Sequence, residues 1–291
     1  MNFGWLNDKS VYKANSIEIM PLASIDNAIS EVTNSSQHDG IWYYPPIVYK
    51  TNKSSPRVVT DRFELSLTHQ IVQINQTQDQ EFLKFMIVFF GWLNGVRLNP
   101  VGWGNLIKTP IKQGELSDFS KPKHSDVIKI LNKAEVFWNA HLQDNLANLM
   151  LGALNWYSFT QSYERIFERF MGQYSVFDTL YRIVAIKLGL TKDVSHSKRF
   201  CYVSNNLQLV CPSWAQFKNN DTEISIIRNA LIHESMFAGQ PVGFTASSDQ
   251  SDILLDLMAF NCKVIAALIG AEGQYTRASC ETKQLQAFDI D

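Results

Sequence analysis

The sequence predicts an α+β protein in which a first domain that contains β-strands is followed by an all-α helical bundle. The stretch from Ile41 to Thr60 is rich in β-branched and aromatic residues and is broken by prolines and serines, which is typical of strands and turns. From Ser125 to Gly270, apolar residues recur at spacings of three and four, which indicates helices. Residues 99–125 contain three prolines and three glycines, as a loop or linker does. We therefore expect a mixed β/α domain of unknown role over residues 1–120, an all-α domain over residues 125–272 and a flexible tail over residues 273–291.

The first domain is expected to contain several strands and one helix. The double proline near Tyr44 suits an edge strand or a bend, because proline cannot donate a ladder hydrogen bond. The expected strands are Ile41–Tyr49, Arg57–Thr60, the alternating residues Phe63, Leu65 and Leu67, and Gln70–Ile74, which continues or pairs with them. A helix is expected from about Asp79 to Leu93, because aromatic residues recur there at helical spacing and Asn94-Gly95 supplies a stop.

The second domain is expected to be helical throughout, apart from an irregular section over residues 191–220 that contains Pro212. Ser125 is a candidate N-cap, and Gly189 is a candidate stop. A break is expected around Gly172–Ser175. The expected helices are Ser125–Trp138, Asn145 to about Phe170, Phe177–Leu188, a helix that begins at Asp221 or Thr222 and ends before Gly239-Gln240-Pro241, and Ser251–Gly270.

Composition and charge exclude some classes of protein. Hydrophobic residues make up 45% of the 291 residues and charged residues 19%, which predicts a folded chain and argues against disorder. The formal net charge of −2 argues against stable, nonspecific binding of duplex nucleic acid, although a local basic patch remains open. The N-terminus lacks the pattern of a signal peptide, and the apolar run Phe85–Leu93 is shorter than the ~20 residues of a spanning helix. These features predict a soluble, cytoplasmic protein without membrane contact.

The four cysteines do not predict a metal site. They form no CxxC pair, and no histidine lies at zinc-finger spacing from them. Cys201 and Cys211 flank a loop and can bridge in an oxidising compartment, whereas free thiols are the favoured interpretation for a cytosolic protein. We expect no metal and no cofactor.

The most informative segment is Ile226–Glu234, which places Arg228, Asn229 and His233 inside an otherwise apolar helical run. Arginine binds phosphate oxygens with a planar fork, histidine titrates near neutrality and acts as a general base or acid, and asparagine orients the imidazole or donates to an oxyanion. Such a trio suits transfer of an RNA phosphoryl group to its own 2′-hydroxyl. A simpler interpretation remains open, in which Arg228 forms an ordinary ion pair with Glu223 or with an acid on a neighbouring helix, and His233 is exposed near a helix end.

The order of the helices and the Arg-Asn-x-x-x-His spacing resemble the HEPN superfamily (higher eukaryote and prokaryote nucleotide-binding domains). The run Tyr163–Phe170, followed by Phe177–Leu180, is similar to the first helical pair of such domains in toxin and phage-defence proteins. The resemblance covers about residues 125–270. It implies a metal-independent endoribonuclease, a toxin or antiviral-defence effector, that acts as a homodimer on RNA. Arg228 would bind the scissile phosphate, His233 would act as base or acid, and Asn229 would assist. The alternative is a non-catalytic dimerisation or nucleotide-binding module.

Other polar residues are weaker candidates. Glu168 and Asp178 lie in apolar surroundings and are possible supporting acids that contact Arg228, although an ordinary ion pair of Glu168 with Arg165 or Arg169 is the simpler interpretation. His196 is expected to be a surface residue. The first domain offers only Gly102-Trp103-Gly104 in support of a small-molecule enzyme, which is a weak signal. We expect it to sense a trigger or restrain the second domain, alone or with a regulatory partner protein.

Overall fold

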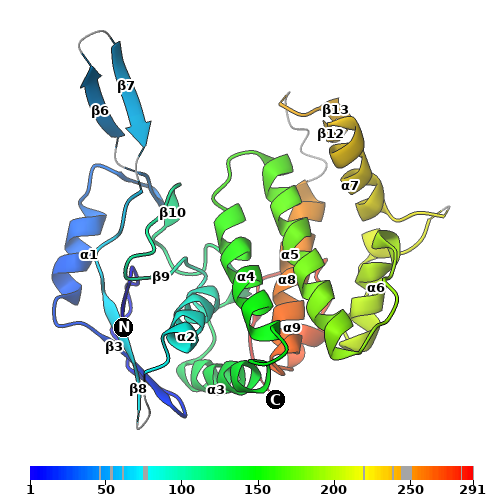
Figure 1. Ribbon diagram of the computed structural model, residues 1–291, viewed down its shortest axis with the longest axis horizontal. Coiled ribbons are helices and arrows are strands. Elements are labelled where there is room, and N and C mark those ends of the chain that lie inside the picture. Colours follow the sequence, from blue (N-terminus) through cyan, green and yellow to red (C-terminus); the bar gives the residue numbers. More distant parts are fainter. Residues whose placement is uncertain are drawn as a thin grey trace. The chain divides into compact units, whose positions relative to one another are not determined.

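The computed structural model describes residues 1–45, 47–52, 55–60, 62–74, 78–218, 220–237, 239–243, 251–282 and 284–290. The chain has a mixed α+β fold, as predicted (Figure 1). It divides into one unit of Met1–Ser117 with Val127–Asn132 and a second unit of Asp118–Asp126 with Lys133–Asp291. The linker expected between the domains is therefore not a simple boundary, because helix α3 (His124–Ala140) contributes residues to both units.

The first unit is built on a five-stranded antiparallel sheet. Its order is β2 (Tyr12–Lys13), β3 (Ile17–Pro21), β8 (His69–Gln73), β1 (Asn2–Gly4) and β9 (Asn99–Pro100). Ile19 pairs with Ile71 in the β3–β8 register, and both side chains are fully buried. Strands β1 to β3 were not expected from the sequence, because segments of two to five residues carry little periodicity.

The predicted helix of the first unit is confirmed as α2 (Gln80–Leu93). The Asp79 side chain accepts hydrogen bonds from the backbone N–H groups of Glu81 and Phe82, which fixes its first turn. Phe90 packs edge-on against Tyr12 of the sheet at 5.1 Å between ring centroids. Helix α1 (Ile25–Thr33) carries a separate small apolar cluster, in which Val32 packs with Trp5 and Ile111.

The remaining strands of the first unit correct part of the prediction. The expected strand around the double proline is two strands, β5 (Trp42–Tyr43) and β6 (Ile47–Asn52), and Pro46 lies outside the described residues. β5 lies between β4 (His38–Asp39) and β10 (Thr109–Pro110), whereas β6 pairs only with β7 (Ser55–Thr60). The strand expected at Phe63, Leu65 and Leu67 is wrong: Phe63 forms one isolated bridge to Asn105, and Leu65 packs on the Trp5 cluster instead of extending a sheet.

The second unit is helical at its centre. Helix α5 packs against both α4 and α8, and these three helices form the core (Figure 1). The helices of this unit after α3 are α4 (Leu146–Thr160), α5 (Ile166–Lys187), α6 (His196–Asn206), η1 (Ser213–Ala215), α7 (Glu223–Glu234), α8 (Ser251–Leu268) and α9 (Gln274–Arg277). Its short strands are β11 (Phe119–Ser120), β12 (Met236–Phe237), β13 (Gln240–Pro241) and β14 (Gln286–Ala287).

The break expected at Gly172–Ser175 is wrong. Helix α5 runs through these residues, and the chain reverses earlier, at residues 161–165. Gly172 is required for close helix packing: a Cβ atom there would lie 2.2 Å from Cγ2 of Thr160 on α4. The next residue, Gln173, is fully buried and donates to Oγ1 of Thr160 at 2.8 Å, while Asn261 of α8 donates to the Gln173 backbone oxygen at 2.9 Å. This contact holds the three central helices in register.

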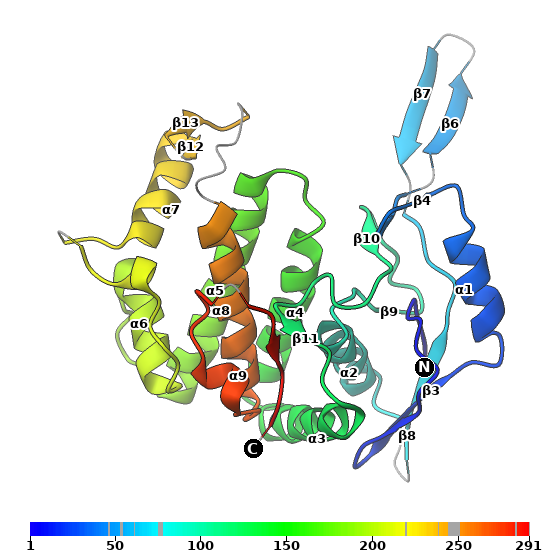
Figure 2. The ribbon, with the colours of Figure 1, turned by 180° about the vertical axis from the view of Figure 1, so that it is seen from behind.

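The C-terminal segment is ordered, which corrects the expected flexible tail. Apart from residues 283 and 291, which lie outside the described residues, it contains α9 and the strand β14, which pairs in parallel with β11 (Figure 2). Phe288 and Tyr275 are buried, and their rings lie 4.8 Å and 5.3 Å from the Phe119 ring. These three aromatic residues are widely spaced in the sequence and are surrounded by polar residues. The composition of residues 273–291 therefore gave no sign that the segment packs.

A buried polar network anchors the same segment. Tyr275 donates its hydroxyl hydrogen to Oδ1 of Asp118 at 2.6 Å, and the Lys263 ammonium donates to the Tyr275 backbone oxygen at 2.7 Å. Burial raises the pKa of Asp118 to about 6, although the Tyr275 hydrogen bond and the Lys263 charge oppose this rise.

The raised pKa of Asp118 predicts a pH-dependent stability. The folded state binds the carboxyl proton more tightly than the unfolded chain, whose pKa is near 3.8, so the stabilisation is complete below that value and is lost as pH rises through about 6. Over this window we expect the free energy of unfolding to fall by up to about 3 kcal/mol. Urea denaturation of the wild type and of Asp118→Asn, at several pH values, measures the effect. An equal pH dependence in the two proteins would contradict it.

Candidate functional site

Helix α7 carries the predicted Arg228–His233 segment and begins where the sequence predicts. Oγ1 of Thr222 accepts a hydrogen bond from the Ser225 backbone N–H at 3.3 Å, as an N-cap does. The helix ends at Ser235, whose backbone is left-handed at φ 53°. Ile224 and Ile227 are buried, and the helix contacts α6 and η1.

The predicted trio divides between two sides of this helix. Arg228 lies one turn after Ile224 on the inward side, and its Nη1 donates to Oδ1 of Asn229 at 2.9 Å. Asn229 and His233 are exposed, together with Ile226, whose side chain is 56% exposed. The structure therefore brings Arg228 and Asn229 together but leaves His233 apart from Arg228 within one chain.

Arg228 has unused hydrogen-bonding capacity. Its Nε atom is buried and has no hydrogen-bond partner. No carboxylate among the described residues lies within 4 Å of its guanidinium, so the ion pair with Glu223 does not form. A buried cationic donor without an acceptor is costly unless an anion satisfies it.

Helices α5 and α6 form a polar cluster, which we call the His196 cluster: Tyr174, Asp178, His196 and Arg199. Arg199 donates from Nη1 to Oδ1 of Asp178 at 2.8 Å and to Nδ1 of His196 at 3.1 Å. The Tyr174 hydroxyl lies 3.4 Å from the same Nδ1. Arg199 also donates from Nη2 to Asp193 at 2.7 Å and from Nε to the Val194 backbone oxygen at 3.0 Å, so its position is fixed by four hydrogen bonds.

The charge of Arg228 acts on this cluster from α7. Burial lowers the pKa of His196, the charges of Arg199 and Arg228 lower it further, and Asp178 opposes them. Burial and the negative charge of Asp178 raise the pKa of Tyr174, against the positive charge of Arg228. Arg228 and the His196 cluster are therefore electrostatically coupled.

Asp178 and Glu168, the two possible supporting acids, do not contact Arg228 as expected. Asp178 pairs with Arg199 instead of Arg228. The Glu168 carboxylate accepts from the Arg165 backbone N–H at 3.4 Å and caps the start of α5. Asp178 belongs to the site through the His196 cluster, whereas Glu168 has a structural contact.

His196, Tyr174 and Arg199 were missed as site residues. The reason is that α6 was expected to be irregular, so no helical register placed His196 and Arg199 on one face. The four-residue spacing of Tyr174 and Asp178 was readable, but the false break at Gly172–Ser175 concealed it.

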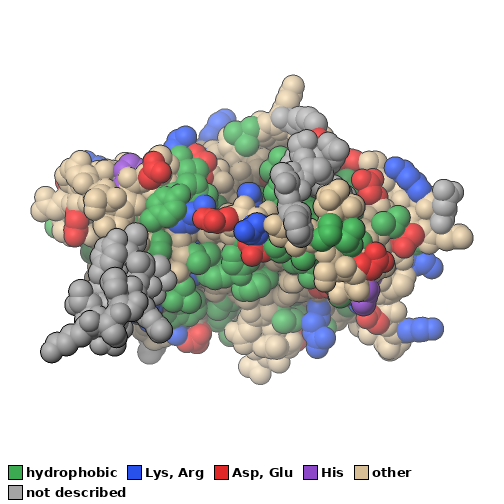
Figure 3. All heavy atoms as spheres, turned by 90° about the horizontal axis from the view of Figure 1, so that it is seen from above, with side chains coloured by type: hydrophobic (Ala, Val, Ile, Leu, Met, Phe, Trp, Pro, Cys, Tyr) green, Lys and Arg blue, Asp and Glu red, His purple; other side chains and the backbone are tan. Residues whose placement is uncertain are grey.

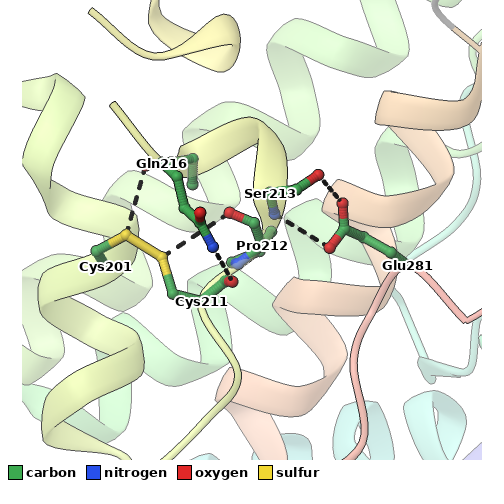
Figure 4. Close-up of a disulfide and its surroundings, with 7 residues drawn as sticks. Cys201, Cys211, Pro212, Ser213, Gln216 and Glu281 are labelled. Atoms are coloured by element: carbon green, nitrogen blue, oxygen red, sulfur yellow. Dashed lines mark hydrogen bonds between the residues drawn. A yellow bond between two sulfur atoms is a disulfide. The ribbon is translucent and has the colours of Figure 1, made fainter. Parts of the chain in front are cut away.

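A disulfide joins α6 to the segment that supports α7. Cys201 and Cys211 are bonded (Figure 4), which corrects the expectation of free thiols for this pair. Cys262 and Cys280 are buried thiols. Just beyond the bridge, the Ser213 backbone N–H and hydroxyl both donate to the Glu281 carboxylate. The contact of η1 with α7 therefore rests on a cross-linked segment.

Removal of this bridge is expected to lower stability. Its cysteines are 10 residues apart, and closing a loop of this length in the unfolded chain corresponds to about 3 kcal/mol. The variant with Cys201→Ser and Cys211→Ser should lose this amount in chemical denaturation, and dithiothreitol should destabilise the wild type but not the variant. Equal stabilities with and without the reductant in the wild type would contradict the bridge.

An aromatic ladder with one exposed and two half-buried rings lies at the C-terminal end of α4. The rings of Trp156 and Phe159 stack at 5.6 Å, and Tyr163 meets Phe159 edge-on at 5.5 Å. Trp156 is 41% exposed. On the face drawn in Figure 3, hydrophobic side chains reach the surface between acidic and basic ones. Stacked, exposed rings of this kind are suited to contact with unpaired bases.

No family model, curated protein or solved structure matches the chain. Within the described ranges, no three His, Cys, Asp or Glu side chains are grouped as metal ligands would be. In the same ranges, no helix has both the length and the apolar character needed to cross a membrane.

Proposed function

We propose that the protein is a metal-independent endoribonuclease of the HEPN type, in which two copies of α7 form one composite active site. The observation that carries the proposal is the Arg228 guanidinium, which has a buried Nε without an acceptor and lies one residue before an exposed Asn229. A phosphodiester supplies the anionic oxygens that this group lacks.

The proposed reaction is transfer of the phosphoryl group to the neighbouring 2′-oxygen. One His233 removes the proton of the 2′-hydroxyl, the 2′-oxygen attacks phosphorus, and the bond from phosphorus to the 5′-oxygen breaks. The second His233 gives a proton to the departing 5′-oxygen. Arg228 holds the non-bridging oxygens, whose charge grows in the transition state, and Asn229 assists it. The products are a 2′,3′-cyclic phosphate and a 5′-hydroxyl end.

A second copy of the chain is needed because of helix geometry. Positions 228 and 233 differ by about 140° around the axis of one helix, so their side chains point away from different sides of that helix. Across a two-fold axis, His233 of one copy can approach Arg228 of the other. The exposed side chains of Ile226 and Ile232, 56% and 42% accessible, would be covered in such a dimer.

The same two exposed isoleucines favour a second candidate, a non-catalytic dimerisation module. Exposure of Ile226 and Ile232 supports a dimer whether or not it cleaves RNA. The two candidates differ in what Arg228 does, because a module without catalysis has no need for an unsatisfied guanidinium. In either case the first unit is the candidate sensor or restraint, which would suit a toxin or antiviral-defence effector.

The proposal is tested by incubating RNA with the full chain in EDTA. We expect cleavage by the wild type and a loss of at least about 100-fold in Arg228→Ala and His233→Ala. Glu234→Ala is the matched control, because Glu234 is exposed on the same helical turn as His233 and has no role in the reaction. Cleavage that persists in both site variants would overturn the proposal, and a stable dimer that cleaves no RNA would favour the second candidate.

A further inference from the structure

We propose that the groove between α5 and the chain that leads into α6 binds a small organic phosphate monoester. The phosphate would contact Arg182 and Lys192, and the apolar part of the ligand would lie against Ile186 and Leu190, all of which line the groove. Its volume of about 610 Å³ lies within the range of pockets that hold small organic ligands. The site is independent of the proposed ribonuclease function, because the proposed reaction on α7 uses none of its residues.

One wall of the groove is a single face of α5. The residues of this wall recur at spacings of three and four, which places them on the same side of a helix: Asp178, Tyr181, Arg182, Ala185 and Ile186. The Ile186 residue is 40% exposed, so a ligand that enters from solvent can contact it.

The second wall is the chain that joins α5 to α6, of which residues 189–193 line the groove. The hydroxyl of the buried Tyr181 accepts from the Val194 backbone N–H at 2.9 Å and donates to Oδ1 of Asp193 at 2.7 Å. Arg199 donates to the Val194 backbone oxygen at 3.0 Å and to Oδ2 of Asp193 at 2.7 Å. Hydrogen bonds within the protein therefore fix this wall, so the groove is formed before a ligand binds.

The charges that line the groove favour an anionic ligand. Arg199 pairs with Asp178 at 2.8 Å and with Asp193 at 2.7 Å, so both carboxylates of the groove already have a cationic partner. Arg182 and Lys192, in contrast, have neither a hydrogen bond nor a carboxylate within 4 Å among the residues that the structure describes. The groove therefore presents two cations without partners, although the whole chain has a formal net charge of −2.

The class of ligand follows from these side chains. A guanidinium binds two oxygens of one phosphate with its planar fork, and an ammonium binds phosphate as a point charge. A phosphate monoester carries a charge of about −1.5 to −2 at pH 7, so it matches two cations better than a singly charged carboxylate does. The Thr191 hydroxyl lines the same groove and is a further donor. Ile186 and Leu190, which are 40% and 36% exposed, supply apolar surface for the organic part.

Phenyl phosphate is a suitable probe, because it joins a phosphate monoester to one apolar ring. Isothermal titration of the full chain should show saturable binding of one molecule per chain. We expect Arg182→Gln and Lys192→Gln each to weaken this binding by about 10-fold, as the loss of one charge-assisted hydrogen bond does. Lys198→Gln is the matched control and should bind as the wild type does, because Lys198 is exposed on α6 and does not line the groove.

The apolar part of the site is tested by Ile186→Ser. This change should weaken the binding of phenyl phosphate several-fold and leave the binding of inorganic phosphate unchanged, because only phenyl phosphate has a ring. Benzoate, which joins the same ring to a carboxylate, should bind more weakly than phenyl phosphate. Thermal melting checks that each variant is folded.

Several results would overturn the inference. The first is a wild type that does not bind phenyl phosphate, and the second is equal binding by the wild type, Arg182→Gln and Lys192→Gln. An equal loss in Lys198→Gln would show an effect of the charge of the whole chain instead of the groove. Benzoate that binds as tightly as phenyl phosphate would contradict the assignment to a phosphate monoester.

A last measurement separates a small molecule from the end of a nucleic acid. An oligodeoxynucleotide should not displace phenyl phosphate, with or without a 5′-phosphate. Displacement only by the 5′-phosphorylated form would make a nucleic-acid end the occupant and would overturn the assignment to a small molecule. None of these probes contains a ribose that can attack, so a failure here leaves the proposed ribonuclease function standing, and a failure of RNA cleavage leaves this site standing.

Discussion

Mixing Arg228→Ala and His233→Ala chains should restore RNA cleavage that neither variant shows alone. If the site needs Arg228 from one copy and His233 from the other, the mixed dimer contains one complete pair. Random exchange of subunits makes half of the dimers mixed, and each mixed dimer holds only one of the two histidines that the proposed reaction uses. The mixture should therefore cleave RNA faster than either variant alone but well below half of the wild-type rate. The measurement is RNA cleavage in EDTA after the two variants have been denatured and refolded together.

The control is refolding of each variant with wild-type chains at the same total concentration. Recovery only in the mixture of the two variants supports a site shared between copies. A mixture that remains inactive, while both variants form dimers with wild-type chains, would contradict the shared site. Full activity of His233→Ala alone would remove His233 from the reaction.

Replacing Gly172 by alanine should destabilise the second unit strongly, whereas the same change at Gly152 should stabilise it. A Cβ at Gly172 would lie 2.2 Å from Thr160 Cγ2, so α4 and α5 must move apart, at a cost of about 1–3 kcal/mol or more. Gly152 lies in the middle of α4, and nothing is within 4 Å of its Cβ position. There alanine should add about 0.5–1 kcal/mol, because glycine loses more backbone entropy in a helix.

Thermal and urea denaturation of the two variants measure these two changes in stability. The comparison is matched, because each change adds one methyl group to a helix of the same core. Equal stability of Gly172→Ala and Gly152→Ala would show that α4 and α5 are not as close as described.

The elements that the sequence predicted best have clear local signals. Helix α2 has Asp79 as a side-chain cap, and α7 has Thr222. Each cap residue directly precedes the helix that it starts, so it can be recognised in the sequence without knowledge of tertiary contacts. Gly189, at φ 63°, likewise follows the end of α5 as expected.

The elements that the sequence did not predict depend on distant partners. Gly172 was interpreted as a helix break, but its role is set by Thr160 on another helix. Phe288 is buried only because Phe119, far away in the sequence, lies beside it. A single sequence does not contain these pairings, so composition alone suggested a loop and a tail.

The candidate site was partly predictable for the same reason. Arg228 and Asn229 are neighbours in the chain, and their contact follows from the helix. His196 reaches the site from α6, whose existence depends on buried packing of Phe200 against Phe177 at 3.5 Å between ring centroids. The spacing from Arg228 to His233 indicated the residue types but not that they lie on different sides of α7.

The central claim is that the chain cleaves RNA by attack of the 2′-oxygen without a metal ion. The most direct measurement is analysis of the cleaved ends after incubation of a labelled RNA with the full chain in EDTA. We predict 2′,3′-cyclic phosphate and 5′-hydroxyl ends, and no cleavage at a position where a single 2′-deoxy sugar replaces the ribose that attacks. Cleavage that requires a divalent cation, or that leaves 5′-phosphate ends, would contradict the account.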